Sequence, residues 1–301
     1  MLEESRDTFE SWFLQAFDVA AKAVWTSYYN PTLSRLMELL PASLLKSFDP
    51  QLSNVLKLLK FAETCAMHYE KHGNTTSHPV IFDSLQRLTN NQKTVESMDI
   101  LVAGADTTAS TLTAAILHIL PAQHIREQLV DSLKKIDFDE KGRLVLSELE
   151  KIDYLVACVK ESLRIGLAVP GRLPRVVPDD PSSPLIVDGK RVPPGTVVSM
   201  SAYTMHFNEK IWGLDAREFN PSRWLTPDAK KLDQYLCTFS KGPRMCIGQN
   251  VATAEVTIVL GYLFKSFHLS LPPNFERPKM ADLFTLEYSK PGVHVNFKSV
   301  I

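Results

Sequence analysis

The sequence predicts a mainly α-helical fold with small β-sheets. Three observations support this prediction. Apolar residues recur at helical spacing in several segments before residue 165, short β-branched runs punctuated by proline and glycine occupy residues 170–206, and a last helical segment follows Cys246. The 301 residues can bury a substantial core, either as one large domain or as two.

The first half of the chain is expected to be helical. From Asp7 to Trp25 the apolar residues recur at helical spacing, and Pro31 ends that run. The further segments expected are helices at about 31–40, 51–69, 94–120 and 147–164, with a polar loop at 72–77. Pro121 closes the third of these helices and Gly166 closes the fourth.

The second half is expected to mix short strands, loops and one long helix. Residues 185–192 predict a hairpin, because Asp188-Gly189 supplies a turn between two β-branched runs. Residues 196–198 predict a further strand. A loop-rich stretch follows from 208 to 242, and the final helix is expected from about Ile247 onward.

Composition excludes several classes of function. The net charge is -1 and no basic run occurs, so nucleic-acid binding has no electrostatic support. The 4 cysteines form no CxxC pair, which argues against a disulfide framework or a structural zinc site and favours a reducing, intracellular compartment. The acidic, polar N-terminus is not expected to be a signal peptide, and no apolar run is long enough to predict a membrane-spanning helix.

The candidate chemistry lies in the decapeptide Phe239–Gly248. A single cysteine is more often a small buried apolar residue than a ligand, and this interpretation is preferred for the other three cysteines. Cys246 differs because a helix is expected directly after it, where unpaired backbone N–H groups and the positive dipole end favour the thiolate. Gly248 permits close approach of a flat cofactor, and Arg244 supplies a permanent cation for a carboxylate. Ligation of a haem iron by cysteine requires these features.

The decapeptide also matches every fixed position of the cytochrome P450 haem-binding signature, Phe-x-x-Gly-x-Arg-x-Cys-x-Gly. The chain therefore resembles the C-terminal, haem-binding portion of a cytochrome P450 monooxygenase, closest to fungal members of secondary metabolism or detoxification. The resemblance implies that Cys246 is the axial ligand of the iron in haem b (iron protoporphyrin IX). It also implies that Phe239 and Gly248 contact the cofactor and that Arg244 binds a propionate.

A second match to the family is Ala103–Thr108, inside the helix expected at 94–120. A glycine in the middle of a helix costs about 1 kcal/mol relative to alanine, so these small residues serve either close helix packing or a function. By resemblance, Gly104 and Thr107 open the helix locally and make room for dioxygen. Asp106 and Thr107 are then expected to deliver protons during O2 activation. The intact pair disfavours isomerase or dehydratase chemistry without O2.

Two further matches concern charged residues. Glu161 and Arg164 stand at i, i+3 on an expected helix and could form only a surface salt bridge. The resemblance implies instead a buried network with Arg223 that holds the loop carrying the cysteine, weakened in part because Ser222 stands where the family usually has glutamate. By resemblance, Arg175 reaches a haem propionate together with Arg244, a surface role being the alternative.

Substrate contacts are implied by resemblance alone, with ordinary core packing as the alternative for each. They are Leu101, Val102, Ala105, Ala168, Val169, Phe284 and Thr285, which suit a hydrophobic small molecule. By resemblance, His206 has at best a propionate- or loop-related role, and a satisfied core histidine is the preferred interpretation. Electrons are expected from a partner of the NADPH-cytochrome P450 reductase type, because no GxGxxG fingerprint occurs. Eukaryotic-type members sit on the endoplasmic reticulum membrane, but no transmembrane anchor is expected in this chain.

The resemblance also sets an expectation for domain organisation. Residues 1–301 are expected to form one partial domain, with 1–93 as the helices that precede the oxygen-binding helix and 94–301 as the haem-binding part. A complete family member has a long stretch before this, including a membrane anchor and a first sheet. Two functions are therefore compared: a haem-thiolate monooxygenase that inserts one oxygen atom from O2 into a hydrophobic small molecule, and a truncated, non-catalytic remnant or haem-binding module.

Overall fold

The protein is described by a computed structural model that covers residues 28–40, 52–289 and 292–300, together with Trp12, Ala16, Phe17, Val19, Ala20, Trp25 and Thr26. Most of the helix expected at Asp7–Trp25 lies outside the described residues. Two compact units are present, Met1–Thr107 and Thr108–Ile301. Helices dominate both, and the sheets are small, so the predicted fold class is confirmed.

The described helices agree with most of the predicted ones. In chain order they are α2 (Pro31–Glu38), α4 (Leu52–His72), α5 (Ile81–Ser84), α6 (Asn90–Ile119), α7 (Gln123–Leu133), α8 (Leu146–Leu149), α9 (Asp153–Gly166), α10 (Ala202–His206), α11 (Glu209–Trp212), α12 (Ala229–Asp233) and α13 (Gln249–Ser266), with 3-10 helices η1 (Pro221–Leu225) and η2 (Gly242–Arg244). The single helix expected at 147–164 is wrong, because the chain turns between α8 and α9. Helix α7 was not predicted.

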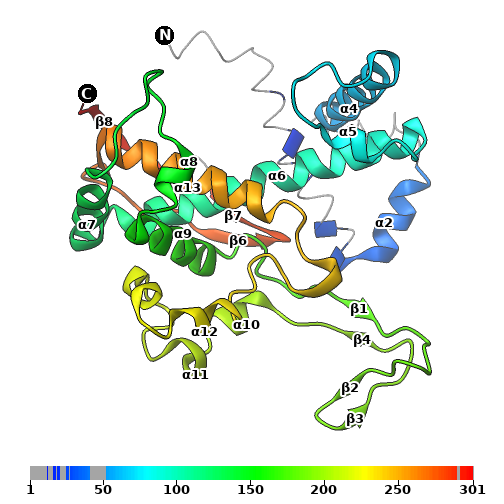
Figure 1. Cartoon of the computed structure of the whole chain (residues 1–301). Helices are drawn as coiled ribbons and strands as arrows, with labels where there is room; N and C mark the ends of the chain where they lie inside the picture. Colours follow the sequence, from blue (N-terminus) through cyan, green and yellow to red (C-terminus); the bar gives the residue numbers. More distant parts are fainter. Residues whose placement is uncertain are drawn as a thin grey trace. The chain divides into compact units, whose positions relative to one another are not determined.

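All described strands pair in antiparallel ribbons. They are β1 (Arg175–Val176) with β4 (Val197–Val198), β2 (Ile186–Val187) with β3 (Lys190–Arg191), β5 (Phe267–Ser270) with β8 (Asn296–Ser299), and β6 (Met280–Leu283) with β7 (Thr285–Tyr288). The predicted hairpin is confirmed, and both of its turn residues, Asp188 and Gly189, have positive φ (47° and 74°), as a type I′ turn requires. This hairpin lies at the far end of the β1–β4 ribbon (Figure 1). The C-terminal ribbons were not predicted.

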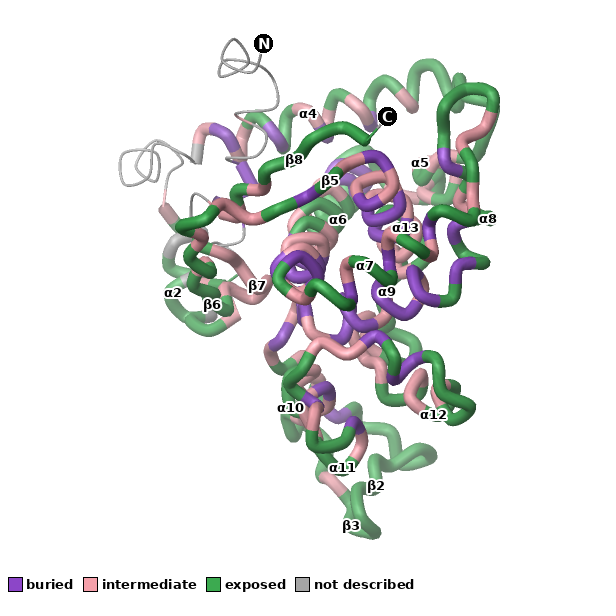
Figure 2. Tube along the Cα trace, turned by 90° about the vertical axis from the view of Figure 1, so that its left-hand side faces the viewer, coloured by how far each residue is buried: buried purple, intermediate pink, exposed green. Residues whose placement is uncertain are grey.

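The core of the second unit lies between α7, α9 and α13, which run beside one another (Figure 1). Their facing sides carry the fully buried residues Leu129, Leu155 and Leu260. Figure 2 shows the same concentration of buried residues in these helices and the exposure of β2 and β3. Burial of this apolar surface at about 25 cal/mol per Å² is the main stabilising contribution to such a core.

Helix α9 ends at Gly166, where the sequence predicted its end, but the glycine has a different role from the one expected. Gly166 was expected to close the helix, but the residue with left-handed geometry is Leu167, at φ 43° and ψ 55°. Gly166 has a different reason to be glycine: a Cβ there would lie 3.1 Å from the Cβ of Ala114 and 3.5 Å from the Cα of Thr111. Gly166 therefore allows α9 to approach the C-terminal part of α6 closely.

The first unit has a smaller core of its own. Ala16, Phe17 and Leu58 are buried there, and Leu101 and Val102 pack against them. A nearly buried Lys93 on α6 pairs with Glu70 on α4, with Nζ and Oε2 2.6 Å apart. Among the described residues, α6 alone is long and apolar enough to cross a membrane by length and composition, a property that core helices of soluble proteins share.

Candidate functional site

Cys246 lies in a tight loop, residues 239–248 (the cysteine loop), which contains η2 and leads into α13. The backbone oxygen of Phe239 accepts a hydrogen bond from Cys246 N–H at 2.8 Å, and the oxygen of Gly242 accepts one from Met245 N–H at 3.0 Å. Ser240 and Gly242 both have left-handed geometry, with φ 62° and 78°. The loop turns the thiol outward, so that of the 4 cysteines only Cys246 is exposed.

The surroundings of the Cys246 thiol fit a flat apolar group. Gly248 is the N-cap of α13, and a Cβ on it would lie 3.9 Å from Cys246 Sγ, so the glycine directly adjoins the sulfur. The apolar side chains of Met245, Ile247 and Val251 are exposed around the loop, Ile247 by 88%. Phe239 is half-buried and packs against the core of the second unit. An accessible sulfur with an apolar rim can accept a bulky hydrophobic cofactor.

The two arginines expected at the cofactor carboxylates are not joined by any contact. Arg244 is exposed on η2 and makes no hydrogen bond or ion pair with the residues that the structure describes. Arg175 is half-buried on β1, and its Nη1 donates to the neighbouring Pro174 O at 2.9 Å. Their joint role therefore stays a prediction.

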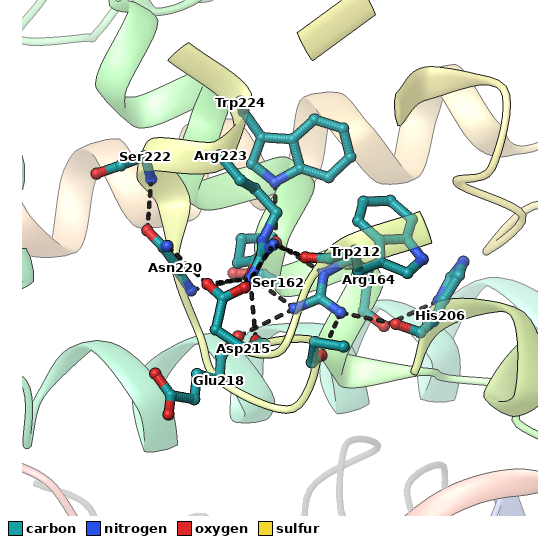
Figure 3. A network of polar contacts seen from close by, with 12 residues as sticks. Ser162, Arg164, His206, Trp212, Asp215, Glu218, Asn220, Ser222, Arg223 and Trp224 are labelled. Carbon is teal, nitrogen blue, oxygen red and sulfur yellow. Dashed lines mark hydrogen bonds and ion pairs between the residues drawn. The ribbon is translucent and has the colours of Figure 1, made fainter. Parts of the chain in front are cut away.

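Glu161 and Arg164 form a fully buried ion pair on α9 (Figure 3). Arg164 Nε and Nη2 donate to the two carboxylate oxygens at 2.9 and 2.8 Å. The remaining guanidinium N–H groups donate to the backbone oxygens of His206, Ala216 and Glu218 at 2.8, 2.6 and 3.0 Å. All five donors of the guanidinium thus have an acceptor. The alternative prediction, that Glu161 and Arg164 form only a surface salt bridge, is therefore wrong.

Arg223 completes the network, as the resemblance implied. Its Nε donates to Glu161 Oε1 at 3.1 Å. Its Nη2 pairs with Asp215 Oδ2 at 2.9 Å, and Trp224 Nε1 donates to Glu161 Oε2 at 2.9 Å (Figure 3). Asp215 thus supplies the second carboxylate that Ser222 does not provide. Burial alone would raise the pKa of Asp215, but the hydrogen bond from Asn220 and the charge of Arg223 outweigh it and lower this pKa.

His206 is a satisfied core histidine, as expected. Its side chain is fully buried at the end of α10, with Nδ1 2.9 Å from Arg164 O and Nε2 accepting from Cys237 N–H at 2.9 Å. Burial lowers the pKa of His206 to about 4. Nearby, Thr238 Oγ1 donates to Leu163 O at 2.8 Å. The segment before the cysteine loop is therefore tied to α9 at two points.

The residues on α6 correct one expectation. The helix is α-helical without interruption from Asn90 to Ile119, so Gly104 and Thr107 do not open it. Thr107 Oγ1 instead donates to Ala103 O at 2.8 Å, the i−4 bond that a helical threonine makes readily. Asp106 stands beside Thr107 in the sequence and is half-buried. Their expected proton delivery stays a prediction.

Part of the predicted substrate set lies together in the second unit. Leu286 N–H donates to Ala168 O at 2.9 Å and Leu286 O accepts from Ser110 Oγ at 2.8 Å, so the turn Phe284–Thr285 lies near Ala168-Val169. Phe284 has φ 76°, and Thr285 Oγ1 is buried without a hydrogen-bond partner among the described residues. The other three, Leu101, Val102 and Ala105, lie in the first unit.

The sequence profile of the family described as Cytochrome P450 matches residues 32–295. The chain belongs to the cytochrome P450 family. The resemblance seen in the sequence is thus confirmed, and its relatives include fungal proteins.

Three relatives illustrate the match. Cytochrome P450 monooxygenase cloA of Claviceps purpurea is 31% identical over 87% of this chain and 53% of its own length. Cytochrome P450 monooxygenase hkm5 of Aspergillus hancockii is 37% identical over 67% of this chain and 40% of its own length. Fusicoccadiene C-8 hydroxylase of Alternaria brassicicola is 33% identical over 78% of this chain and 47% of its own length. The chain spans about half the length of the curated relatives it matches.

Cytochromes P450 carry haem, and the residues present fit it. An exposed thiol next to a glycine and an apolar rim is a suitable donor set for an iron porphyrin, and Arg244 offers a cation without a protein partner among the described residues. Three residues of the network escaped the sequence analysis: Asp215, Asn220 and Trp224. Only the short spacing of Asp215 to Arg223 could have indicated the first of them.

Proposed function

We propose that the protein is a haem-thiolate monooxygenase that inserts one oxygen atom from O2 into a hydrophobic small molecule of fungal secondary metabolism or detoxification. The observation that supports this most directly is the exposed Cys246 thiol next to Gly248, in a loop tied to the buried Glu161–Arg164 pair through His206 and Thr238. When bound, haem b supplies oxygen activation, and a thiolate ligand favours cleavage of the O–O bond.

The chain's own residues take separate roles in this proposal. Cys246 Sγ ligates the iron, and Arg244 and Arg175 bind propionates through charge-assisted hydrogen bonds. Asp106 and Thr107 deliver protons, which requires Thr107 Oγ1 to release its 2.8 Å bond to Ala103 O first. The buried Thr285 Oγ1, without a partner among the described residues, can donate to a polar group on an otherwise apolar substrate.

The partners and location follow from the family. Electrons come from a donor of the NADPH-cytochrome P450 reductase type, and the protein associates with the endoplasmic reticulum membrane. The fungal relatives support a eukaryotic redox system of this kind. The apolar helix α6 is weak support for membrane contact, because core helices share its composition.

The test is the absorption spectrum of the haem-loaded chain after reduction and exposure to carbon monoxide. A strongly red-shifted Soret band that Cys246→Ser abolishes is the expected result. Cys65→Ser is the matched control, because Cys65 is a half-buried cysteine in the first unit and should leave the band in place. A band typical of histidine ligation, or one that survives Cys246→Ser, would contradict the proposal.

A second candidate is a non-catalytic, haem-binding remnant. The two candidates differ in turnover. With reductase, NADPH and a panel of hydrophobic small molecules, the monooxygenase must give oxygenated product, detected by mass spectrometry with labelled O2. A thiolate-type spectrum without any labelled product favours the second candidate.

A further inference from the structure

His206 connects two parts of the chain that are distant in sequence. It is the last residue of α10, and its side chain is completely buried. One ring nitrogen lies against the end of α9, 2.9 Å from Arg164 O, and the other lies against the segment before the cysteine loop, 2.9 Å from Cys237 N. The ring of Trp212 packs edge-on against it.

These contacts determine the protonation of the ring. A carbonyl oxygen only accepts, so Nδ1, which faces Arg164 O, must carry the proton. A backbone N–H only donates, so Nε2, which faces Cys237, must carry the lone pair. The imidazole is therefore neutral. The charged groups near it, Arg164, Glu161 and Lys241, come from α9 and the cysteine loop.

The Cys237 end of this bridge leads directly into the cysteine loop. Cys237 O accepts from Ser240 N–H at 2.9 Å, and two residues further on Phe239 O accepts from Cys246 N–H at 2.8 Å. The position of the Cys246 backbone thus depends on where residues 237–239 are held. Besides Thr238 Oγ1, the His206 ring is the described side chain that hydrogen-bonds these residues to the α9–α10 framework.

We propose that His206 is a positioning residue for Cys246. Its Nε2 holds the Cys237 backbone in place, and this determines the position of Cys246 Sγ in the cysteine loop. The assignment rests on the proposed function in one respect, that Cys246 is the haem ligand. A buried histidine that only fills space would need neither hydrogen bond, and this difference makes the role testable.

Two amide substitutions separate the two nitrogens of the ring. The amide of asparagine stands near the Nδ1 position, so His206→Asn keeps a donor for Arg164 O and loses the acceptor for Cys237. The amide of glutamine reaches the Nε2 position, so His206→Gln keeps an acceptor for Cys237 N–H. His118→Asn is the matched control, because His118 in the same unit is half-buried and its Nε2 contacts Arg277 rather than the cysteine loop.

The first measurement is amide hydrogen exchange of residues 237–246 in the full, haem-free chain. His206→Asn is expected to speed exchange at Cys237 and Cys246 about tenfold, the value of one lost buried hydrogen bond. His206→Gln is expected to restore slow exchange, and His118→Asn to leave this segment unchanged. The proposal is overturned if asparagine and glutamine behave alike, or if exchange in this segment follows global stability in all three variants.

The second measurement uses the unaltered chain, so it does not depend on a variant that folds. Nitrogen-15 NMR of the His206 imidazole must place the proton on Nδ1, and a proton on Nε2 overturns the proposal. A third, in the haem-loaded chain reduced under carbon monoxide, should show a smaller share of the thiolate-type Soret band in His206→Asn than in His206→Gln. A wild-type chain without that band overturns the proposed function, whereas the exchange and NMR results decide the role of His206 on their own.

Discussion

Glu161 and Arg164 stand one turn apart on α9 with both side chains completely buried, and two parallel hydrogen bonds of 2.9 and 2.8 Å join carboxylate and guanidinium. A buried pair of this kind is weak evidence for net stability, because desolvation offsets the attraction. Removing one partner of the pair is strongly destabilising, since the remaining charge then stays buried without its partner.

Glu161→Gln should therefore lower the free energy of unfolding by about 3–5 kcal/mol. The carboxylate oxygens also accept from Arg223, Asn220 and Trp224, so more than one donor loses its charged acceptor. The matched control is Glu148→Gln, which removes an exposed i, i+3 pair with Lys151 and should cost less than about 1 kcal/mol. Urea unfolding followed by circular dichroism measures both, and equal losses would contradict the prediction.

Asp215→Asn should destabilise the protein by about 1–3 kcal/mol, because it leaves the nearly buried Arg223 Nη2 with a neutral acceptor. Ser222→Ala should change the stability by less than about 0.5 kcal/mol, since the Ser222 hydroxyl makes no hydrogen bond with the residues that the structure describes and the Ser222 contact to Asn220 is made by the backbone N–H. The comparison is made by thermal unfolding. A larger loss in Ser222→Ala than in Asp215→Asn would mean that Asp215 is not the partner on which Arg223 depends.

Stability should fall as the pH drops from about 6.5 to 4, the ordinary pKa of histidine being about 6.5. The pKa values of His206 and His118 are both lowered to about 4 by burial, so the unfolded chain binds more protons than the folded one in this range. Each histidine can lower the free energy of unfolding by on the order of 3 kcal/mol once the pH is below both pKa values. Urea titrations at several pH values test this, and His206→Gln should flatten the dependence. A flat profile in the wild type would refute it.

Gly166→Ala should cost about 1–3 kcal/mol, because the added Cβ meets Ala114 at 3.1 Å in a packed helix contact. Gly104→Ala, on the exposed side of α6, meets nothing within 4 Å and should stabilise the helix by about 1 kcal/mol. Chemical denaturation of both variants checks the opposite signs. If Gly104→Ala also abolishes turnover, the open space beside Gly104 is needed for the reaction rather than for folding.

The cysteine motif, the charged pair on α9 and the β2–β3 hairpin could be predicted because each depends on residues close together in sequence. The partners of Arg164 could not, because three of its acceptors are backbone oxygens of His206, Ala216 and Glu218, and any residue type supplies a backbone oxygen. Asp215 escaped for a related reason: it lies in an irregular loop, where periodicity carries no information.

One expectation was right for a different physical reason, and another was wrong. Gly166 looked like a helix stop, yet Leu167 takes the left-handed position, and the glycine is needed for contact with Ala114. Thr107 and Gly104 suggested an opened helix, but the hydroxyl bonds back to Ala103 O and the helix continues. In both cases helix packing and local hydrogen bonding outweighed the pattern.

The last turn of α9 leaves backbone carbonyls that the helix itself cannot satisfy, and two of them, on Leu163 and Arg164, are served by Thr238 and His206. Leu163 and Thr238 are 75 positions apart. At roughly 5–20 residues per second of synthesis, the ribosome needs about 4–15 s to make the intervening chain. Until Thr238 has been made, water must satisfy the Leu163 carbonyl, so we expect the final turn of α9 and the thiol-bearing loop to become ordered together.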